Sequence, residues 1–286
     1  MLTDYHLHLR PDEEDTPPER YFTAANAERY REAAEERGIA ELGVAEHIHR
    51  FTQSLDIWLH PWWRKWARDD VDDYCAFVRE ETDMRLGIEA DFVAGRENRI
   101  AAFLDAREWD FVVGSVHFVR DAAVDLEGPE WEHVWGRGDS ADRIWQRYFE
   151  TLAEAARSGL YDIIAHPDLV KVWGSARPGP ERDPRRYYEP AVQAMLDAGV
   201  AMEMSTAGLR KPAGELYPSR PLLEMAVDAG LPIALSSDAH VPDQVGYRYE
   251  DAVAALEAAG VTEICVFEGR QRRLVPVGAG APASRS

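Results

Sequence analysis

Cysteine is nearly absent from this sequence, which contains only Cys75 and Cys265. Two cysteines cannot form the disulfide framework of a small secreted domain, so we expect a reducing compartment. The first residues lack the basic and apolar regions of a secretory signal peptide, and no apolar run approaches the roughly 20 residues of a membrane span. The sequence therefore predicts a cytoplasmic protein with no membrane partner.

Positive charge is also scarce. The chain has 32 Lys and Arg against 52 Asp and Glu, which gives a formal net charge of -20 at pH 7. Binding to nucleic-acid phosphates needs a basic face, so no nucleic-acid partner is expected. A small anionic substrate remains compatible with this charge if metal ions hold it. The oligomeric state is left open.

The length of 286 residues and the 45% hydrophobic content are enough for a large buried core, and they exclude a disordered chain. No composition shift marks a second domain. We expect a single domain over residues 1–270 and a disordered tail over 271–286, which ends in Gly-Ala-Gly-Ala-Pro-Ala-Ser-Arg-Ser.

One local pattern recurs five times along the chain: a helical stretch ends in glycine, and a short apolar strand follows at once. The expected strands of this pattern cover residues 39–45, 160–165, 200–204, 231–235 and 261–267. Glycine suits the left-handed position just past a helix. The strands are almost continuously apolar, as in a parallel sheet that helices cover on its outer face.

Three more strands and three clear helical patterns complete the alternation. The strands are expected at 2–5, 85–88 and 111–115, and the helices at 19–37, 140–157 and 219–229. Seven strand-then-helix units, with a possible extra strand at 261–267, predict a closed (β/α) barrel or a doubly wound sheet. The long segments 49–70 and 171–186 follow strands, so in a barrel they are expected as loops on the functional face.

Metal-ligating residue types stand at the ends of six of these strands. They are His6, His8, His47, Glu89, His117, His166, Asp238 and His240. A single histidine at a strand end is usually a hydrogen-bonded structural residue, but so many at matching ends predict an active site at the carboxyl rim of a barrel. His60 and His133 lie in loops and are expected to be structural, and His49 is left undecided.

These residue types suit a divalent metal centre. His6 and His8 alternate along an extended strand end, so both imidazoles point to the same side. Imidazole and carboxylate ligands suit Zn, Fe or Mn, and the two cysteines lie away from the strand ends. A carboxylate such as Glu89 can bridge two ions about 3.5–4 Å apart, and such a pair can clamp an in-line displacement.

Five stretches carry a resemblance to a known family. They are Gly-Ile-Glu-Ala-Asp-Phe at 87–92, Gly-Ser-Val-His-Phe at 114–118, Ser-Thr-Ala-Gly-Leu-Arg at 205–210, Ser-Asp-Ala-His at 237–240 and the surroundings of Tyr217-Pro218. Over residues 2–270 the chain resembles the PHP (polymerase and histidinol phosphatase) superfamily of metal-dependent phosphoesterases. Within it, the chain looks most like the stand-alone PHP-type histidinol-phosphatases. The resemblance implies a distorted (β/α)7 barrel with two or three divalent ions (Zn, Mn or Fe) at the carboxyl ends of the strands.

The resemblance also implies the ligand sets. One ion is bound by His6, His8, Glu89 and Asp238, a second shares Glu89 with His117 and His166, and a third uses His47 and His240. Asp238 and His240 are expected to take part in catalysis as well. The family usually has a further histidine six residues after the His-x-His pair, where this chain has Glu14, which is expected to ligate in its place. Glu46 and Ser205 also depart from the family pattern (Asp and Asn), which is expected to affect substrate preference.

The function expected from this resemblance is hydrolysis of a phosphate monoester by a metal-bridging hydroxide. The expected substrate is L-histidinol phosphate, cleaved to L-histidinol and phosphate in histidine biosynthesis. Arg210, just past the sixth strand, is expected to grip the phosphate in a bidentate fork, and Lys171 is a second candidate. The aromatic segment 58–66 either covers the site or packs onto the barrel rim.

Several alternatives stay open at this point. Another phosphorylated small molecule could be the substrate. An amidohydrolase would use the same order of His-x-His, two later histidines and a late aspartate, but it commonly bridges its metals with a lysine at the fourth strand, and the only lysines are Lys65, Lys171 and Lys211. The net charge opposes a polymerase-associated domain acting on DNA. A metal site that serves only stability would need closed coordination.

Overall fold

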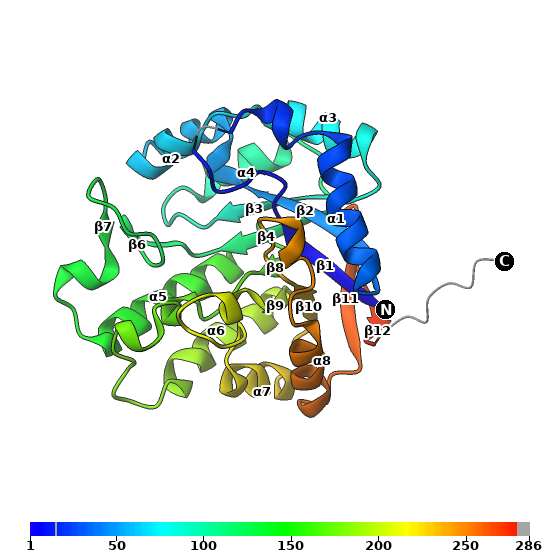
Figure 1. The fold of residues 1–286 in the computed structure, drawn as a ribbon. Coiled ribbons are helices and arrows are strands. Elements are labelled where there is room, and N and C mark those ends of the chain that lie inside the picture. Colours follow the sequence, from blue (N-terminus) through cyan, green and yellow to red (C-terminus); the bar gives the residue numbers. More distant parts are fainter. Residues whose placement is uncertain (15, 279–286) are drawn as a thin grey trace.

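A parallel sheet of seven strands forms the centre of the molecule in the computed structural model, which describes residues 1–14 and 16–278 (Figure 1). The strand order follows the chain: β1 (Leu2–Leu7), β2 (Ile39–His47), β3 (Arg85–Asp91), β4 (Phe111–Ser115), β8 (Ile163–Ile164), β9 (Ala201–Ser205) and β10 (Ile233–Ser236). Every neighbouring pair is parallel. A doubly wound sheet would reverse its strand order part-way, so this alternative is wrong.

The two edge strands of the sheet meet at their carboxyl ends. Ala239, just past β10, bridges Leu7 of β1 in parallel register. The His8 amide donates to the Ala239 carbonyl at 2.7 Å, and the Ala239 amide donates to the His6 carbonyl at 3.3 Å. The sheet is therefore a nearly closed barrel, which confirms the expected distorted (β/α)7 architecture.

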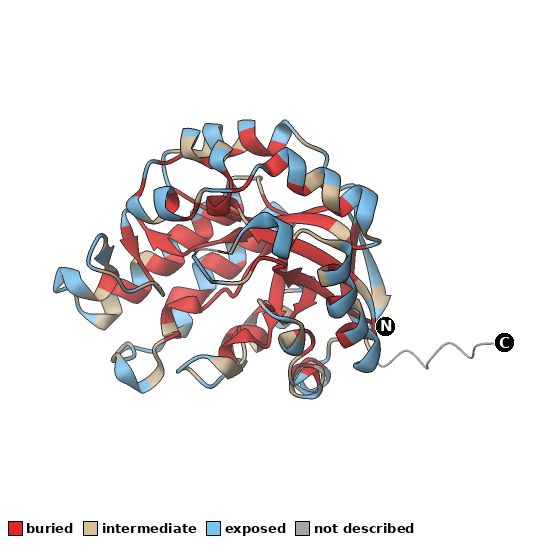
Figure 2. Ribbon diagram, turned by 45° about the horizontal axis from the view of Figure 1, so that its top comes forward, coloured by how far each residue is buried: buried red, intermediate tan, exposed pale blue. Residues whose placement is uncertain are grey.

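Helices cover the outside of the barrel, with their buried faces toward the strands (Figure 2). They are α1 (Ala24–Glu36), α3 (Val71–Glu81), α4 (Glu97–Asp105), α5 (Ala141–Arg157), α6 (Arg185–Ala198), α7 (Arg220–Asp228) and α8 (Tyr249–Ala258), with the short α2 (Pro61–Trp66) near the rim. In α5, Ile144, Tyr148 and Leu152 are buried at helical spacing, as the sequence indicates. None of the helices within the described residues combines the length and the apolar character needed to cross a membrane.

Shorter elements occupy the connections. A small sheet contains β5 (Phe118–Val119), β6 (Ala122–Ala123) and β7 (Glu132–His133), and single 3-10 turns are η1 (Pro18–Arg20), η2 (Ile48–Arg50), η3 (Thr52–Asp56), η4 (Val134–Arg137), η5 (Leu169–Lys171), η6 (Gly174–Ala176), η7 (Ala207–Arg210) and η8 (Pro242–Gln244). Segment 49–70, expected as a loop, is instead built largely from η2, η3 and α2. Its aromatic residues pack the turns together, with Trp63 fully buried.

Small residues make room for large ones inside the barrel. The ring of Phe111 fills the space over two glycines: a Cβ at Gly87 would lie 2.2 Å from this ring, and one at Gly43 would lie 2.6 Å from it. Tyr5 packs edge-on against Phe111, with ring centroids 5.0 Å apart. The interior is therefore a packed core beneath the rim, as in other barrels of parallel strands.

A hairpin closes the amino-terminal end of the barrel. Strands β11 (Glu263–Glu268) and β12 (Gln271–Pro276) pair antiparallel, and Cys265, Val266 and Phe267 enter the interior core. The expected tail from residue 271 is therefore wrong, because 271–276 satisfy the backbone groups of β11. The domain extends past residue 270, and residues 279–286 of the expected tail lie outside the described residues.

Candidate metal centre

The carboxyl ends of six barrel strands bring the predicted ligands together. Three groups have ligand atoms that all lie within 4.8 Å of one another: His6, His8 and Asp238; Glu89, His117 and His166; and His8, His47 and His240. Strand ends of a parallel barrel meet at one rim, which explains why residues so far apart in the sequence converge.

Glu89 lies between the first two groups and turns one oxygen toward each. Its Oε2 is 3.3 Å from His6 Nε2 and 3.7 Å from His8 Nε2. Its Oε1 is 3.2 Å from His166 Nε2 and 3.5 Å from His117 Nε2. This carboxylate is thus placed to bridge two cations.

Asp238 completes the first group. Its Oδ1 lies 3.3 Å from His8 Nε2 and 3.8 Å from His6 Nε2. The residue has φ of 51°, and His166 in the second group has φ of 23°. Non-glycine residues rarely adopt this left-handed region, and such strain is held in place at functional sites.

Buried anions and imidazoles set the charge of this centre. Burial favours neutral Glu89, but His47, His6 and His117 outweigh it and hold the pKa of Glu89 well below its usual range. Burial disfavours the imidazolium of His117, yet Asp91 and Glu89 raise the pKa of His117 to about 10. Protons thus compensate the carboxylates where a metal ion would otherwise do so, and metal binding would release these protons.

Several inward-facing atoms have no hydrogen-bond partner among the described residues. They include His6 Nε2, both ring nitrogens of His8 and Asp238 Oδ1, all of which are buried, while Glu89 Oε2 contacts the His47 ring but has no hydrogen bond. Buried polar atoms are normally hydrogen-bonded, so a set of unpartnered lone pairs that face one another calls for a cation. The residues present therefore fit divalent metal ions.

Two further carboxylates support the ligands and were missed by the sequence analysis. Glu203 Oε1 is 2.7 Å from His6 Nδ1, and its Oε2 accepts from the His166 amide at 2.6 Å. Asp91 Oδ1 is 2.6 Å from His117 Nδ1. Such partners orient metal-binding imidazoles. A signal existed for both: Glu203 interrupts an apolar strand, and Asp91 shares a strand face with Glu89.

Glu46 also lies behind the centre rather than in the cavity. Its Oε1 accepts from the amides of Leu9 and Arg10 at 2.7 and 2.9 Å, and its Oε2 accepts from Arg50 Nη1 at 2.7 Å. Burial opposes the charge, but Arg50 and His8 lower the pKa of Glu46 to about 2. The residue therefore ties the segment after β1 to the end of β2.

Two predicted site residues lie elsewhere. Glu14 is paired with Lys65 and Arg68, each at 3.2 Å, and its side chain is 45% exposed. These cations hold Glu14 on the surface, and it is in none of the three ligand groups, so its expected role as a metal ligand finds no support in this geometry. Lys171 Nζ lies 3.0 Å from Asp168 Oδ2 and donates to the Leu216 carbonyl at 2.8 Å, so its donors are engaged away from the metal ligands.

Arg210 occupies an intermediate position. Its Nη2 donates to the carbonyls of Ser237 and Asp238, both at 2.8 Å. Its Nη1 is buried and has no hydrogen-bond partner within the described part of the chain. Arg210 therefore holds the main chain at Asp238 and keeps one donor available.

A cavity of about 280 Å³ opens over the ligands. Beside His47, His117, His166, Asp238 and His240, its walls include Asp12, Trp62, Trp66, Phe118, Asp125 and Lys211. The aromatic segment 58–66 both covers the site and packs the rim. Trp62 and Trp66 line the cavity, while Trp63 and Trp58 pack against each other with ring centroids 5.6 Å apart.

The remaining three histidines fall into two kinds, two that cap short helices and one that lines the cavity. His60 Nδ1 accepts from the Trp62 amide and His133 Nδ1 accepts from the Trp135 amide, both at 3.2 Å, so both cap short helices as structural residues. His49 is buried, lines the cavity and has its Nδ1 3.6 Å from Asp91 Oδ2.

Several known proteins have sequences similar to this chain. A PHP domain family model matches residues 21–207. A Deinococcus radiodurans protein named "Probable histidinol-phosphatase" is 32% identical over 96% of this chain and 99% of its own length. A histidinol-phosphatase of Bacillus subtilis is 27% identical over 60% of this chain and 69% of its own length.

A solved structure shares the fold. The histidinol phosphate phosphatase of Lactococcus lactis, determined with Zn, L-histidinol and phosphate, superposes with a TM-score of 0.69 at 20% identity. The match covers 95% of this chain and 98% of that one.

Proposed function

The chain belongs to the PHP domain family, and from this premise we propose that it is a metal-dependent phosphatase that hydrolyses L-histidinol phosphate to L-histidinol and phosphate. The observation that carries the proposal is the placement of Glu89, whose two oxygens face two separate histidine groups at the base of one cavity. Two cations bridged by a carboxylate are suited to phosphate monoester hydrolysis.

Two or three divalent ions of Zn, Mn or Fe are proposed as cofactors. When bound, such ions supply a nucleophile from water at neutral pH and neutralise charge on the phosphoryl group. His6, His8 and Asp238 would hold one ion, and His117 and His166 the other, with Glu89 between them. Glu203 and Asp91 keep the imidazoles of His6 and His117 in the orientation that ligation needs.

Cationic side chains near the cavity would hold the phosphate. Arg210 does not line the cavity itself, but its unpartnered Nη1 keeps a donor free at the main chain that carries Asp238. Lys211, which the sequence analysis did not select, lines the cavity directly. Lys171 does not line this cavity and pairs with carboxylates instead.

Asp125 is the feature that favours an amino-alcohol phosphate over a generic one. It lines the cavity, and its Oδ1 is buried with no hydrogen-bond partner among residues 1–14 and 16–278. The substrate carries an ammonium group and an imidazole, either of which can donate to this oxygen. Trp62, Trp66 and Phe118 supply the apolar walls that an imidazole ring needs.

The amidohydrolase alternative finds no support. Such enzymes commonly bridge their metals with a lysine, but the three lysines of the chain are not among the grouped ligands. Another phosphorylated small molecule stays open as the substrate. It would be cleaved by the same metal chemistry, and only its contacts with Asp125 and the aromatic wall would differ.

The test is phosphate release by protein reconstituted with Zn, Mn or Fe, comparing L-histidinol phosphate with p-nitrophenyl phosphate. We expect kcat/KM to favour histidinol phosphate by several hundredfold, on the order of 3–4 kcal/mol. Equal, slow turnover of both would overturn the substrate and keep the chemistry. No turnover of either would overturn the proposed function.

Asp125→Asn sharpens this test. Loss of one charge-assisted hydrogen bond should raise KM for histidinol phosphate by about 10- to 100-fold. Turnover of p-nitrophenyl phosphate should stay unchanged. The matched control is Glu127→Gln, because Glu127 in the same segment is exposed and pairs with Arg177. Equal KM changes in both variants would remove Asp125 from substrate recognition.

A further inference from the structure

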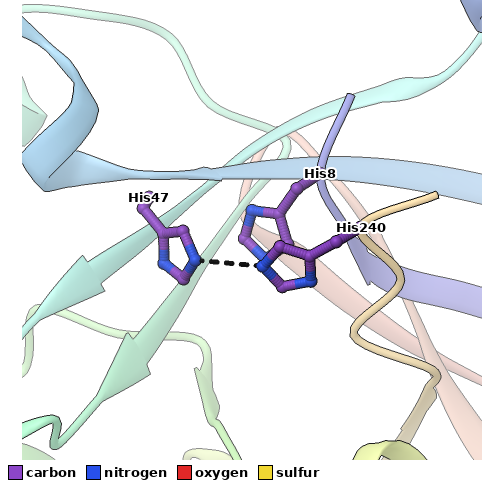
Figure 3. A group of neighbouring side chains, drawn as sticks. All are labelled: His8, His47 and His240. Atoms are coloured by element: carbon purple, nitrogen blue, oxygen red, sulfur yellow. Dashed lines mark hydrogen bonds between the residues drawn. The ribbon is translucent and has the colours of Figure 1, made fainter. Parts of the chain in front are cut away.

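The third histidine group has no carboxylate ligand from Glu14, which pairs with Lys65 and Arg68 instead. This group contains His8, His47 and His240, which come from the ends of β1, β2 and β10 (Figure 3). His8 also belongs to the group with His6 and Asp238. If His8 serves that inner ion, a third ion is left with only His47 and His240 and needs another donor.

The two remaining imidazoles face each other. His47 Nε2 and His240 Nε2 are 3.3 Å apart, along the dashed line of Figure 3. His240 Nδ1 lies 3.2 Å from the Asp238 carbonyl, which can only accept, so in the neutral ring the proton resides on Nδ1. His240 Nε2 therefore presents a lone pair toward His47 and the cavity.

Asp12 points a carboxylate oxygen at the same place. Its Oδ2 is 3.5 Å from His240 Nε2, and the residue lines the cavity together with His47 and His240. Glu14, by contrast, is held by Lys65 and Arg68 and is not part of the cavity wall.

A buried arginine fixes the position of Asp12. Arg50 Nη2 donates to Asp12 Oδ1 at 2.6 Å, while Arg50 Nη1 donates to Glu46 Oε2 at 2.7 Å. Arg50 is itself only 1% exposed, so it is a rigid support. One oxygen of Asp12 is thus engaged by Arg50, and the other is left facing the imidazoles.

We propose that Asp12, rather than Glu14, is the carboxylate ligand of a third divalent ion held with His47 and His240. Two imidazoles and one carboxylate, with open positions toward the cavity, suit Fe(II), Mn(II) or Zn(II). Arg50 is the positioning residue of this site. The inference deepens the proposed function, because the open positions face the space where a phosphate would lie.

The experiment counts metal ions without substrate. Protein variants are stripped with chelator, reconstituted with Mn(II) alone, desalted and analysed for metal content, and Mn(II) affinity is followed by electron paramagnetic resonance of the free ion. Wild type is expected to bind three ions. Asp12→Asn should retain two and weaken the third by at least about 10-fold, the loss typical of removing even a supporting group.

Glu14→Gln is the matched control and should bind three ions with unchanged affinity. Asp12 is 63% exposed, so Asp12→Asn should fold, which far-ultraviolet circular dichroism checks. Arg50→Lys, which retains the charge but not the fork, should also weaken the third ion. Three tight ions in Asp12→Asn, loss of an ion in Glu14→Gln, or only two ions in wild type would overturn the inference. Because no substrate is present, these outcomes do not depend on whether histidinol phosphate is turned over.

Discussion

At the amino-terminal end of the barrel, Asp110 and Asp162 meet several donors each, whereas at the carboxyl-terminal end Glu89 and Asp238 keep buried oxygens without a hydrogen-bond partner among the described residues. Asp110 accepts from Gly269, from Leu86 and from Arg79 at 3.1, 2.9 and 2.6 Å. Asp162 accepts from the Val112 amide at 2.8 Å and from Arg270 Nε at 2.9 Å.

Buried carboxylates therefore have two different tasks in one barrel. At the amino-terminal end, aspartates tie the β11–β12 hairpin to the strands, and the structure already contains every partner that they need. At the carboxyl-terminal end, carboxylates are buried beside the imidazoles of the three histidine groups, and some of their oxygens have no hydrogen-bond partner among the described residues. Such an arrangement favours a cation, because a metal ion there would satisfy the lone pairs that the described residues leave without a hydrogen-bond partner.

Removing one carboxylate charge at each end of the barrel is the strongest test of this comparison. Asp238→Asn should lower kcat/KM by about 10³-fold or more, about 4 kcal/mol, because a metal ligand is lost. The metal content should fall in parallel, because Asp238 supplies one atom of the first ligand group.

Asp110→Asn is the counterpart at the other end. It should cost about 1–3 kcal/mol of unfolding free energy, because the donors that it leaves are partly buried, while kcat/KM per folded molecule stays unchanged. Steady-state kinetics, metal analysis and urea denaturation of both variants are the measurements. Two variants with the same profile would show that the ends do not differ in task.

The next effect concerns packing at the closed end. Phe267→Ala removes a ring that is 2% exposed and lies 5.5 Å from the Tyr5 ring centroid, so we expect a loss of about 3–5 kcal/mol in unfolding free energy. Activity of the folded, metal-loaded enzyme should change little. Leu274→Ala, in the same hairpin but 50% exposed, should cost far less. A large fall in kcat for Phe267→Ala would mean that the hairpin shapes the distant metal centre.

The smallest expected effect concerns two basic side chains near the carboxyl-terminal end of the barrel. Arg210→Ala should raise KM for phosphate substrates by about 10-fold, roughly 1.4 kcal/mol, because a free donor is lost. The variant also loses the two bonds to the Ser237 and Asp238 carbonyls, so its metal content is measured alongside. Lys171→Ala should leave KM within about twofold, since Lys171 is engaged by Asp168 and Glu215. Kinetics on one phosphate substrate decide the matter, and a reversed order would exchange the roles of the two residues.

Much of the site was predictable because strands and helices alternate regularly along the chain. His6 and His8 alternate at the end of one strand, and Glu89, His117 and His166 follow three others, so a barrel of parallel strands had to gather them at one rim. The barrel itself was predictable from the repeated helix, glycine and apolar strand. The short β8 strand and the β12 strand were less visible, because pairing with neighbours decides the bounds of strands.

By itself, the sequence determined the barrel and the ligand types at its rim, since hydrophobic period and strand ends are local properties of the chain. Only the tertiary structure decided which carboxylate of the segment after β1 faces the histidines. Asp12 and Glu14 are two residues apart, and their roles depend on which cation each meets: Arg50 for Asp12, and Lys65 and Arg68 for Glu14. Irregular segments have no period, so the direction of their side chains is set by the partners that the fold brings to them.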